Sequence, residues 1–189
     1  MSLMSRVLPS AQGLSVAEFW ALAEGQAERL ELIEGEVVAL PPSSAYNSII
    51  AILIATALNN HVLPRKLGYV TGADGGYRTG TNTVRQPDVA FISKERLVGF
   101  PKHFDVAPDL AVEVVSPSEN VMKKAREYFQ AGTRIVWAVM PDERLVYVMT
   151  PAEDGQFITR ELGLDDTLEG GAVLPDLRLP VRDIFPEMA

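Results

Sequence analysis

Residues 87–92 (PDVAFI) and residues 109–115 (DLAVEVV) are the two stretches that decide the fold. Both are short runs rich in β-branched residues, a pattern typical of strands buried in a sheet. Each run also carries a carboxylate where a core strand is normally apolar, Asp88 in the first and Glu113 in the second. An ionised carboxylate in such surroundings is costly unless a cation or strong hydrogen-bond donors meet it. The two runs therefore predict neighbouring strands that hold buried charge.

Two interpretations fit these carboxylates. A single buried carboxylate is normally explained by a salt bridge to an arginine. Two carboxylates on neighbouring strands favour a shared metal ion, because like charges close together repel each other. Asp109 and Glu113 lie four residues apart on one strand face, a separation of roughly 13 Å that is too wide for one ion. Adjacent strands lie about 4.8 Å apart, so Asp88 and Glu113 are the pair that we expect to hold a metal.

The composition limits the kinds of site that the chain can build. The chain has 189 residues, 47% of them hydrophobic, and we expect a single domain over residues 1–189. It contains no cysteine and two histidines, which excludes thiolate zinc sites and a multi-histidine centre. We therefore expect oxygen ligands and Mg²⁺ or Mn²⁺ as the cofactor.

Residues 1–12 lack the apolar stretch of a signal peptide, and no apolar run reaches the roughly 18 residues of a membrane span, so we expect a cytoplasmic protein.

Charge is unevenly distributed along the chain. The net charge is −8, and residues 142–189 contain 11 acidic and 4 basic side chains, so the preceding part is nearly neutral. That neutral part bears both carboxylate strands, where a bound metal would add positive charge. No broad basic patch is present, so tight nonspecific binding of duplex nucleic acid is not expected. We expect residues 1–13 to be flexible and residues 142–189 to form acidic strands and a loop.

Start and stop signals define the N-terminal elements. A capping box at Ser15 predicts a short helix that Gly25 ends. Residues 29–40 form two strand-like arms that meet at the Glu-Gly dipeptide of residues 34–35, a hairpin signal. Glu31, in the first arm, either faces a site or is exposed, and the pattern does not decide between the two.

The middle of the chain predicts a helix followed by strand and loop. Residues 46–62 carry the broad apolar stripe of a largely buried helix. His61, near its end, is expected at the surface, where a histidine complements the helix dipole. Residues 68–78 have strand and turn character, and residues 79–85 are expected to form a polar loop.

A second helix follows the Glu113 strand directly. Residues 116–119 (SPSE) combine a serine cap, a proline at the first helical position and a glutamate, so the helix should begin at about Pro117. Gly132 should end it. Residues 134–140 and 144–150 then predict two further strands joined by a turn.

This helix could supply a cation to the carboxylates. Its first two turns stay close to the end of the Glu113 strand, so Lys123 and Lys124 are candidates. Consecutive helical residues differ in direction by about 100°, so at most one of them faces the site. Lys123 has the spacing of a surface ion pair with Glu127, whereas Lys124 shares a face with Tyr128. We therefore expect Lys124 to point to the two carboxylates and to stabilise charge that develops on a phosphate.

Taken together, these motifs resemble the Uma2 family, also called DUF820. The quoted motifs are RLELIEG at 29–35, RQPDVAF at 85–91, APDLAVEVVSP at 107–117, K-x₃-Y-x₂-AG followed by VW at 124–137, and LPDLRLPV at 174–181. The resemblance implies the PD-(D/E)XK restriction-endonuclease-like superfamily. It also implies an α/β (α+β) fold, with a mixed central β-sheet flanked by helices and an N-terminal β-hairpin. The implied activity is Mg²⁺-dependent cleavage of phosphodiester bonds.

The resemblance also assigns residues. It would make Asp88 the PD aspartate and Glu113 the (D/E) residue, both of them metal ligands. The superfamily's lysine position, two residues after Glu113, is Val115 here, so the lysine would come from the following helix. Lys124 matches the family's lysine in that helix. Asp88, Glu113, Lys124 and Glu31 are therefore the candidate catalytic residues.

Two further positions depart from the family pattern and keep several functions open. Tyr46 stands where the family often has a histidine, and Asn120 where an aspartate is common. The chain is expected to be an endonuclease acting on nucleic acid, in particular DNA. The alternatives are a catalytically degenerate member that binds nucleic acid or a protein, and an unrelated metal hydrolase of small phosphoesters. Cleavage of two strands would suit a two-fold homodimer, and no membrane partner is expected.

Overall fold

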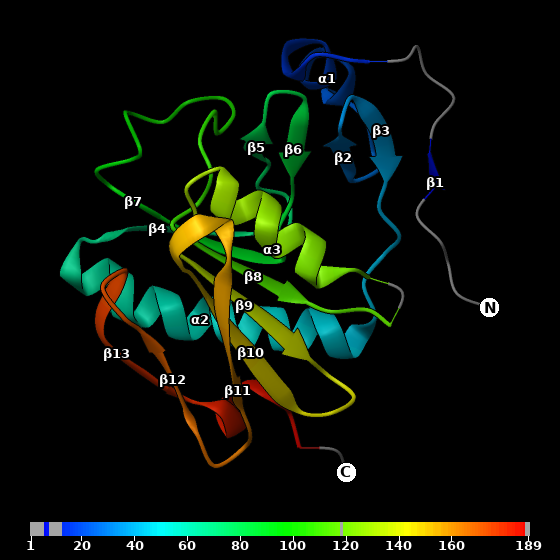
Figure 1. Cartoon of the computed structure of the whole chain (residues 1–189). Coiled ribbons are helices and arrows are strands. Elements are labelled where there is room, and N and C mark those ends of the chain that lie inside the picture. Colours follow the sequence, from blue (N-terminus) through cyan, green and yellow to red (C-terminus); the bar gives the residue numbers. More distant parts are fainter. Residues whose placement is uncertain (1–5, 8–12, 118, 188–189) are drawn as a thin grey trace.

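The computed structural model describes residues 6–7, 13–117 and 119–187 (Figure 1). The predicted flexibility of residues 1–13 concerns residues that lie mostly outside the described part of the chain. Ser118, in the predicted start of the second helix, also lies outside it. The helices are α1 (Val16–Ala23), α2 (Ala45–Arg65) and α3 (Val121–Gln130), with 3₁₀ turns η1 (Glu153–Gly155) and η2 (Val181–Ile184). The strands are β1 (Arg6–Val7), β2 (Leu30–Ile33), β3 (Glu36–Ala39), β4 (Gly68–Gly72), β5 (Tyr77–Gly80), β6 (Thr83–Arg85), β7 (Val89–Ser93), β8 (Leu110–Val114), β9 (Ile135–Met140), β10 (Leu145–Pro151), β11 (Phe157–Leu162), β12 (Thr167–Gly170) and β13 (Leu174–Pro180).

The larger sheet has six strands in the order β11-β10-β9-β8-β7-β4. Strands β8 and β9 run parallel, and the other neighbours run antiparallel, so the sheet is mixed. The two carboxylate-bearing runs become β8 and the start of β7, which pair with each other. Because their side chains are apolar apart from those carboxylates, both strands are buried on both faces.

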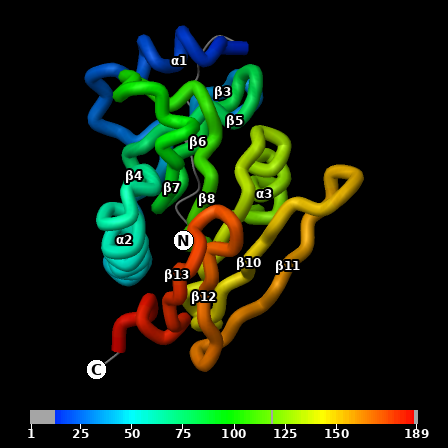
Figure 2. The backbone as a smooth tube through the Cα atoms, turned by 90° about the vertical axis from the view of Figure 1, so that its left-hand side faces the viewer, coloured from blue at the N-terminus to red at the C-terminus, as the bar shows by residue number. Residues whose placement is uncertain are grey.

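Helices cover the two faces of this sheet, as Figure 2 shows with α2 and α3 on opposite sides of β7 and β8. On one face, α2 packs against side chains such as Phe91 and Trp137, and the β12–β13 hairpin closes the same core. On the other face, α3 packs through Ala125 and Tyr128. This arrangement confirms the predicted fold class.

Helix α2 is longer than predicted, because it continues to Arg65. By length and composition alone it could cross a membrane, which the sequence reading did not anticipate. In the fold its inner face, including Ile54 and Leu58, is buried against the larger sheet, so it serves as a core helix. The prediction of a surface position for His61 is wrong: His61 lies inside the longer helix and is only 8% exposed.

The smaller sheet has five strands in the order β1-β3-β2-β6-β5 and is covered by α1. The predicted β2–β3 hairpin is confirmed, and Glu34 and Gly35 have φ of 52° and 87° at its turn. Positive φ at both central positions matches the right-handed twist of the strands, which is why a Glu-Gly pair is tolerated there. The capping box at Ser15 is also present at the start of α1.

Two predicted boundaries are corrected by the structure. Residues 79–85 do not form a polar loop but most of the β5–β6 hairpin, because threonine suits a strand as well as a turn. Helix α3 begins at Val121, and its N-cap is Asn120, whose side chain accepts a hydrogen bond from the Lys123 amide. The segment before it forms a turn in which the Glu119 amide donates to Ser116. The predicted end of this helix at Gly132, with φ of 94°, is confirmed.

Candidate active site

A cavity of about 800 Å³ opens where the two sheets meet. Its walls come from the β2–β3 hairpin, the segment that leads into α2, the start of β7, the end of β8 and the first turn of α3. Figure 1 shows the N-terminal ends of α2 and α3 on the same side of the molecule, below the hairpin. The cavity brings together all four candidates from the sequence, Glu31, Asp88, Glu113 and Lys124.

Asp88 and Glu113 face each other across two antiparallel strands. The register pairs Val89 with Val112, so the next pair outward is Asp88 with Glu113. Asp88 lies just before β7 and accepts a hydrogen bond from the Val114 amide over 2.9 Å, which holds its carboxylate beside the end of β8. Directly opposed residues of an antiparallel pair project to the same side of the sheet. Both carboxylates therefore line one cavity wall.

Lys124 extends from the first turn of α3 to the Glu113 carboxylate. Its Nζ lies 2.8 Å from Glu113 Oε2 and 2.6 Å from Glu119 Oε1. The lysine side chain is 13% exposed, so this cluster of one ammonium group and two carboxylates is largely shielded from water. Sequence reasoning missed Glu119, to which it assigned a helix-start role. Its place five residues before Lys124, outside the helix, leaves no periodic signal for this contact.

Tyr128 completes the surroundings of Glu113. Its hydroxyl donates a hydrogen bond to Glu113 Oε1 over 2.7 Å, and the tyrosine is fully buried. Lys124 and Tyr128 are four residues apart on α3, so one face of the helix supplies a donor to each oxygen of the same carboxylate. Val115 packs in the apolar cluster beneath α3 and also lines the cavity, but it supplies no charge there.

Glu31 belongs to a largely buried ion-pair network that links the hairpin to α3. Arg85 lies at its centre between Glu31 and Glu127, and we call this network the Arg85 brace. Arg85 donates to Glu31 Oε2 over 2.8 Å and, through Nε, to Glu127 Oε2 over 2.8 Å. The Gln86 amide donates to the other oxygen of Glu31 over 2.9 Å. Glu31 is 1% exposed, so it faces the site rather than solvent, but protein donors already hold both of its oxygens. Glu31 is therefore linked through Arg85 to Glu127 of α3.

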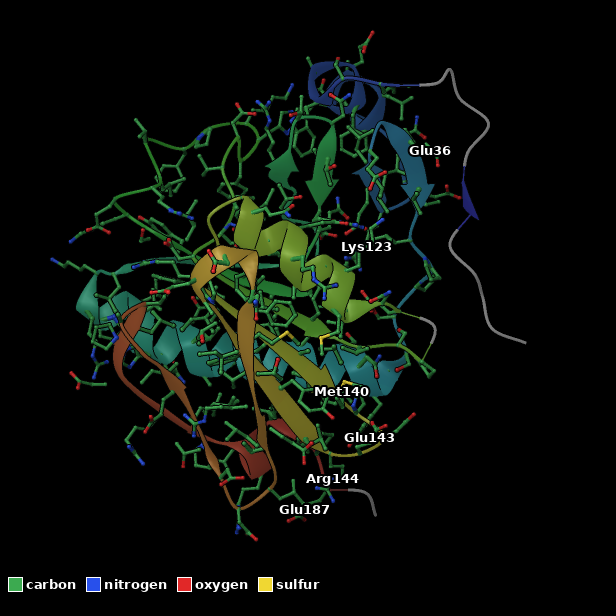
Figure 3. All side chains as sticks on the ribbon, in the orientation of Figure 1. Glu36, Lys123, Met140, Glu143, Arg144 and Glu187 are labelled. Carbon is green, nitrogen blue, oxygen red and sulfur yellow. The ribbon has the colours of Figure 1, made fainter. Side chains whose placement is uncertain are left out.

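The other lysine of the first turn has a different environment. Lys123 is 56% exposed and reaches toward the hairpin, 3.4 Å from Glu34 (Figure 3). It also lies 3.9 Å from Glu127, the partner that the helix spacing predicted. Tyr46, the second departure from the family pattern, packs partly buried against the core of the larger sheet. Asn120 caps α3, a role that asparagine and aspartate perform equally well.

Burial and the repulsion between neighbouring carboxylates change the pKa values of the acidic side chains in the site. Burial raises the pKa of Glu113 to about 8, and the neighbouring carboxylates of Glu119 and Asp88 add to the effect that Lys124 opposes. Burial also raises the pKa of Asp88, against the Val114 amide and Lys124. For Glu31, burial is outweighed by the charges of Lys124 and Arg85, which hold its pKa below the usual value. Asp88 and Glu113 therefore lack sufficient counter-charge, whereas Glu31 has it.

A divalent cation fits this donor set as a partly hydrated ion. Within residues 6–7, 13–117 and 119–187, no group of three or more acidic or histidine side chains is arranged to hold a metal. Asp88 and Glu113 nevertheless provide two carboxylates side by side. Mg²⁺ is commonly held by one or two carboxylates, with waters and substrate phosphate in the remaining positions. The excess of buried negative charge favours the same type of ligand.

The chain is similar to known proteins in its sequence and in its fold. The model of the Uma2 family, described as "Putative restriction endonuclease", matches residues 16–182. The fold is similar to the crystal structure of a protein from Anabaena variabilis described as "a putative nuclease belonging to DUF820", with a TM-score of 0.79. The two are 23% identical, and the match covers 91% of this chain and 97% of that chain. No match was found among curated proteins.

Proposed function

The chain belongs to the Uma2 family, and from this premise we propose that it is a metal-dependent endonuclease that hydrolyses phosphodiester bonds of nucleic acid, in particular DNA. The observation that carries the proposal is the group formed by Asp88, Glu113 and Lys124. Two carboxylates oppose each other across neighbouring strands, and an ammonium group is hydrogen-bonded to one of them in the same cavity. In such a set the two carboxylates can bind a cation, and the ammonium group can bind an anionic substrate next to it.

Asp88 and Glu113 would hold Mg²⁺ or Mn²⁺ in this site. The chemistry that such an ion supplies is polarisation of the phosphate and a lowered pKa of bound water. The chain itself contributes the orientation of both ligands. The Val114 amide holds Asp88, and the Tyr128 hydroxyl holds Glu113.

Lys124 is the group that we assign to the phosphate. An ammonium group has three donors, and Glu113 and Glu119 accept two of them, so one donor stays available toward the cavity. Because the side chain is largely buried, its charge acts on a bound phosphate with little screening. The Arg85 brace keeps the hairpin and α3 together, and with them the walls of the cavity.

One observation favours a second candidate, a non-catalytic member that binds nucleic acid or a protein. Tyr128 and Lys124 already satisfy both oxygens of Glu113, as expected for a structural ion pair. In that case the carboxylate pair would bind no metal. Either function is compatible with the two-fold homodimer that we propose for cleavage of two strands.

Metal binding and plasmid cleavage by Asp88→Asn test the proposal. Asparagine keeps an acceptor for the Val114 amide but loses the charge, so Mn²⁺ affinity measured by calorimetry should fall at least about tenfold, and cleavage should be lost. Asp105→Asn, at an exposed position outside the cavity, is the matched control and should behave as wild type. Unchanged Mn²⁺ affinity in Asp88→Asn would show that Asp88 holds no metal. Mn²⁺ binding by wild type without cleavage of DNA or RNA would favour the non-catalytic candidate.

A further inference from the structure

The cavity is lined by four basic side chains, and three of them are neutralised by carboxylates within the protein. These three cations have ion-pair contacts of 2.5 to 3.9 Å. Their partners are Glu31 and Glu127 for Arg85, Glu34 and Glu127 for Lys123, and Glu113 and Glu119 for Lys124. A polyanion that enters the cavity therefore gains less from each of these paired cations than it would from an unpaired one.

Arg29 is the fourth cation, and it differs from the others. Across the part of the chain that the structure describes, no carboxylate lies within ion-pair distance of its guanidinium. Its hydrogen bonds go to the side chain and the carbonyl of Gln86, both at 3.4 Å, the long end of the normal range. A guanidinium carries five N–H donors, so most of them stay available. The side chain is half-buried on the cavity wall.

The backbone places Arg29 firmly beside the proposed metal ligands. It directly precedes β2, and its carbonyl accepts a hydrogen bond from the Leu40 amide over 2.9 Å, which closes the base of the hairpin. Gln86, which receives its side-chain bonds, is two residues before Asp88. The positive charge of Arg29 also offsets part of the rise that burial causes in the pKa of Asp88. Arg29 is therefore close to Asp88 without forming an ion pair with it.

We propose that Arg29 binds a backbone phosphate of the nucleic-acid substrate and positions the chain over the carboxylate pair, an inference that rests on the proposed function. The planar guanidinium matches phosphate oxygens in a two-bond contact, which an ammonium group cannot form. In a protein of net charge −8, an unpaired cation beside an acidic site makes the cavity more receptive to an anion. Arg29 is a positioning residue for the phosphodiester substrate class, shared by DNA and RNA.

The test measures binding apart from cleavage. Fluorescence anisotropy with labelled duplex DNA and with labelled RNA, in Ca²⁺ or EDTA and over a series of salt concentrations, is recorded for wild type, Arg29→Ala and Arg29→Lys. Arg160→Ala is the matched control, because Arg160 is an exposed arginine of β11 outside the cavity. Calorimetry with Mn²⁺ provides the readout for the metal ligands, and circular dichroism verifies the fold of each variant.

Arg29→Ala should bind its preferred nucleic acid about tenfold more weakly, as expected from loss of a charged hydrogen-bond partner. Its salt slope should be smaller by about one. Arg29→Lys should recover the slope but not the full affinity, and Mn²⁺ affinity should not fall in either variant. Affinity and slope equal to those of wild type and Arg160→Ala would overturn the assignment of Arg29 and leave the proposed function standing. Wild-type protein that binds neither DNA nor RNA would overturn both.

Discussion

The hydroxyl of Tyr128 donates a hydrogen bond to Glu113 over 2.7 Å, and both side chains are buried in the centre of the molecule. A buried carboxylate requires such donors, because transfer of its charge out of water is otherwise unfavourable. Tyr128 comes from the last turn of α3 and Glu113 from β8, an inner strand of the larger sheet. This hydrogen bond therefore joins a packing contact of the fold to a candidate metal ligand.

We expect Tyr128→Phe to destabilise the protein by about 1–3 kcal/mol, because one oxygen of a buried carboxyl group loses its donor. Urea unfolding followed by circular dichroism measures this change. Tyr69→Phe removes a hydroxyl from a tyrosine that is 44% exposed and should change the free energy of unfolding by less than about 0.5 kcal/mol. Equal stability of the two variants would show that Glu113 does not depend on the Tyr128 hydroxyl.

Lys124→Ala should reduce single-turnover cleavage of a plasmid in Mn²⁺ by about 10²–10³-fold, the usual cost of losing one preorganised electrostatic partner. Lys123→Ala removes the same charge from the neighbouring position, which is exposed and directed to Glu34, and should stay near wild type. Both variants require a folding control, because Lys124 also neutralises buried carboxylates. A loss confined to Lys123→Ala would contradict the assignment.

Stability should depend on pH through Glu113, whose pKa burial raises from 4.5 to about 8. The folded protein then holds a proton that the unfolded chain releases between these values. The free energy of unfolding therefore decreases as pH rises from about 4.5 to about 8. Glu113→Gln lacks this ionisation, so its melting temperature should match wild type near pH 5 and exceed it near pH 8.5.

The same ionisation should affect metal binding. An ion binds the ionised carboxylate, so the apparent Mn²⁺ affinity of wild type should increase up to about pH 8 and then level off. Calorimetry in buffers of different ionisation enthalpy measures the proton released on binding. Mn²⁺ affinity that is constant from pH 6 to pH 9 would show that Glu113 is already ionised or is not a ligand.

The elements that sequence reasoning predicted well carry their own start and stop chemistry. Ser15 with its capping box and the Glu34–Gly35 turn depend on neighbours within a few residues, and both are present in the structure. The predicted start of α3 was wrong because Glu119, counted as a residue of the first helical turn, precedes the N-cap Asn120 and binds Lys124 with one carboxylate oxygen. His61 was misplaced because it lies on the buried face of α2, together with Leu58 and Val62.

In the site, too, features set by nearby residues could be predicted from the sequence, whereas features set by distant residues could not. Strand alternation and helix direction were sufficient to select Asp88, Glu113 and Lys124, because each lies in, or directly beside, a short regular element. The orientation of Glu31 was left open, since it depends on Arg85, 54 residues further along the chain. No local pattern could assign the brace or the third carboxylate at Glu119. Contacts between distant segments are set by the tertiary fold alone.

The brace has a consequence for the order in which the protein matures during synthesis. Arg85 must meet Glu31 behind it and Glu127 ahead of it, so the walls of the cavity cannot come together until α3 has left the ribosome. The parallel partner of β8, which carries Glu113, is synthesised later still. An incomplete chain therefore exposes its acidic strands without a closed cavity. Any activity of this site therefore requires that the chain has been synthesised beyond β9.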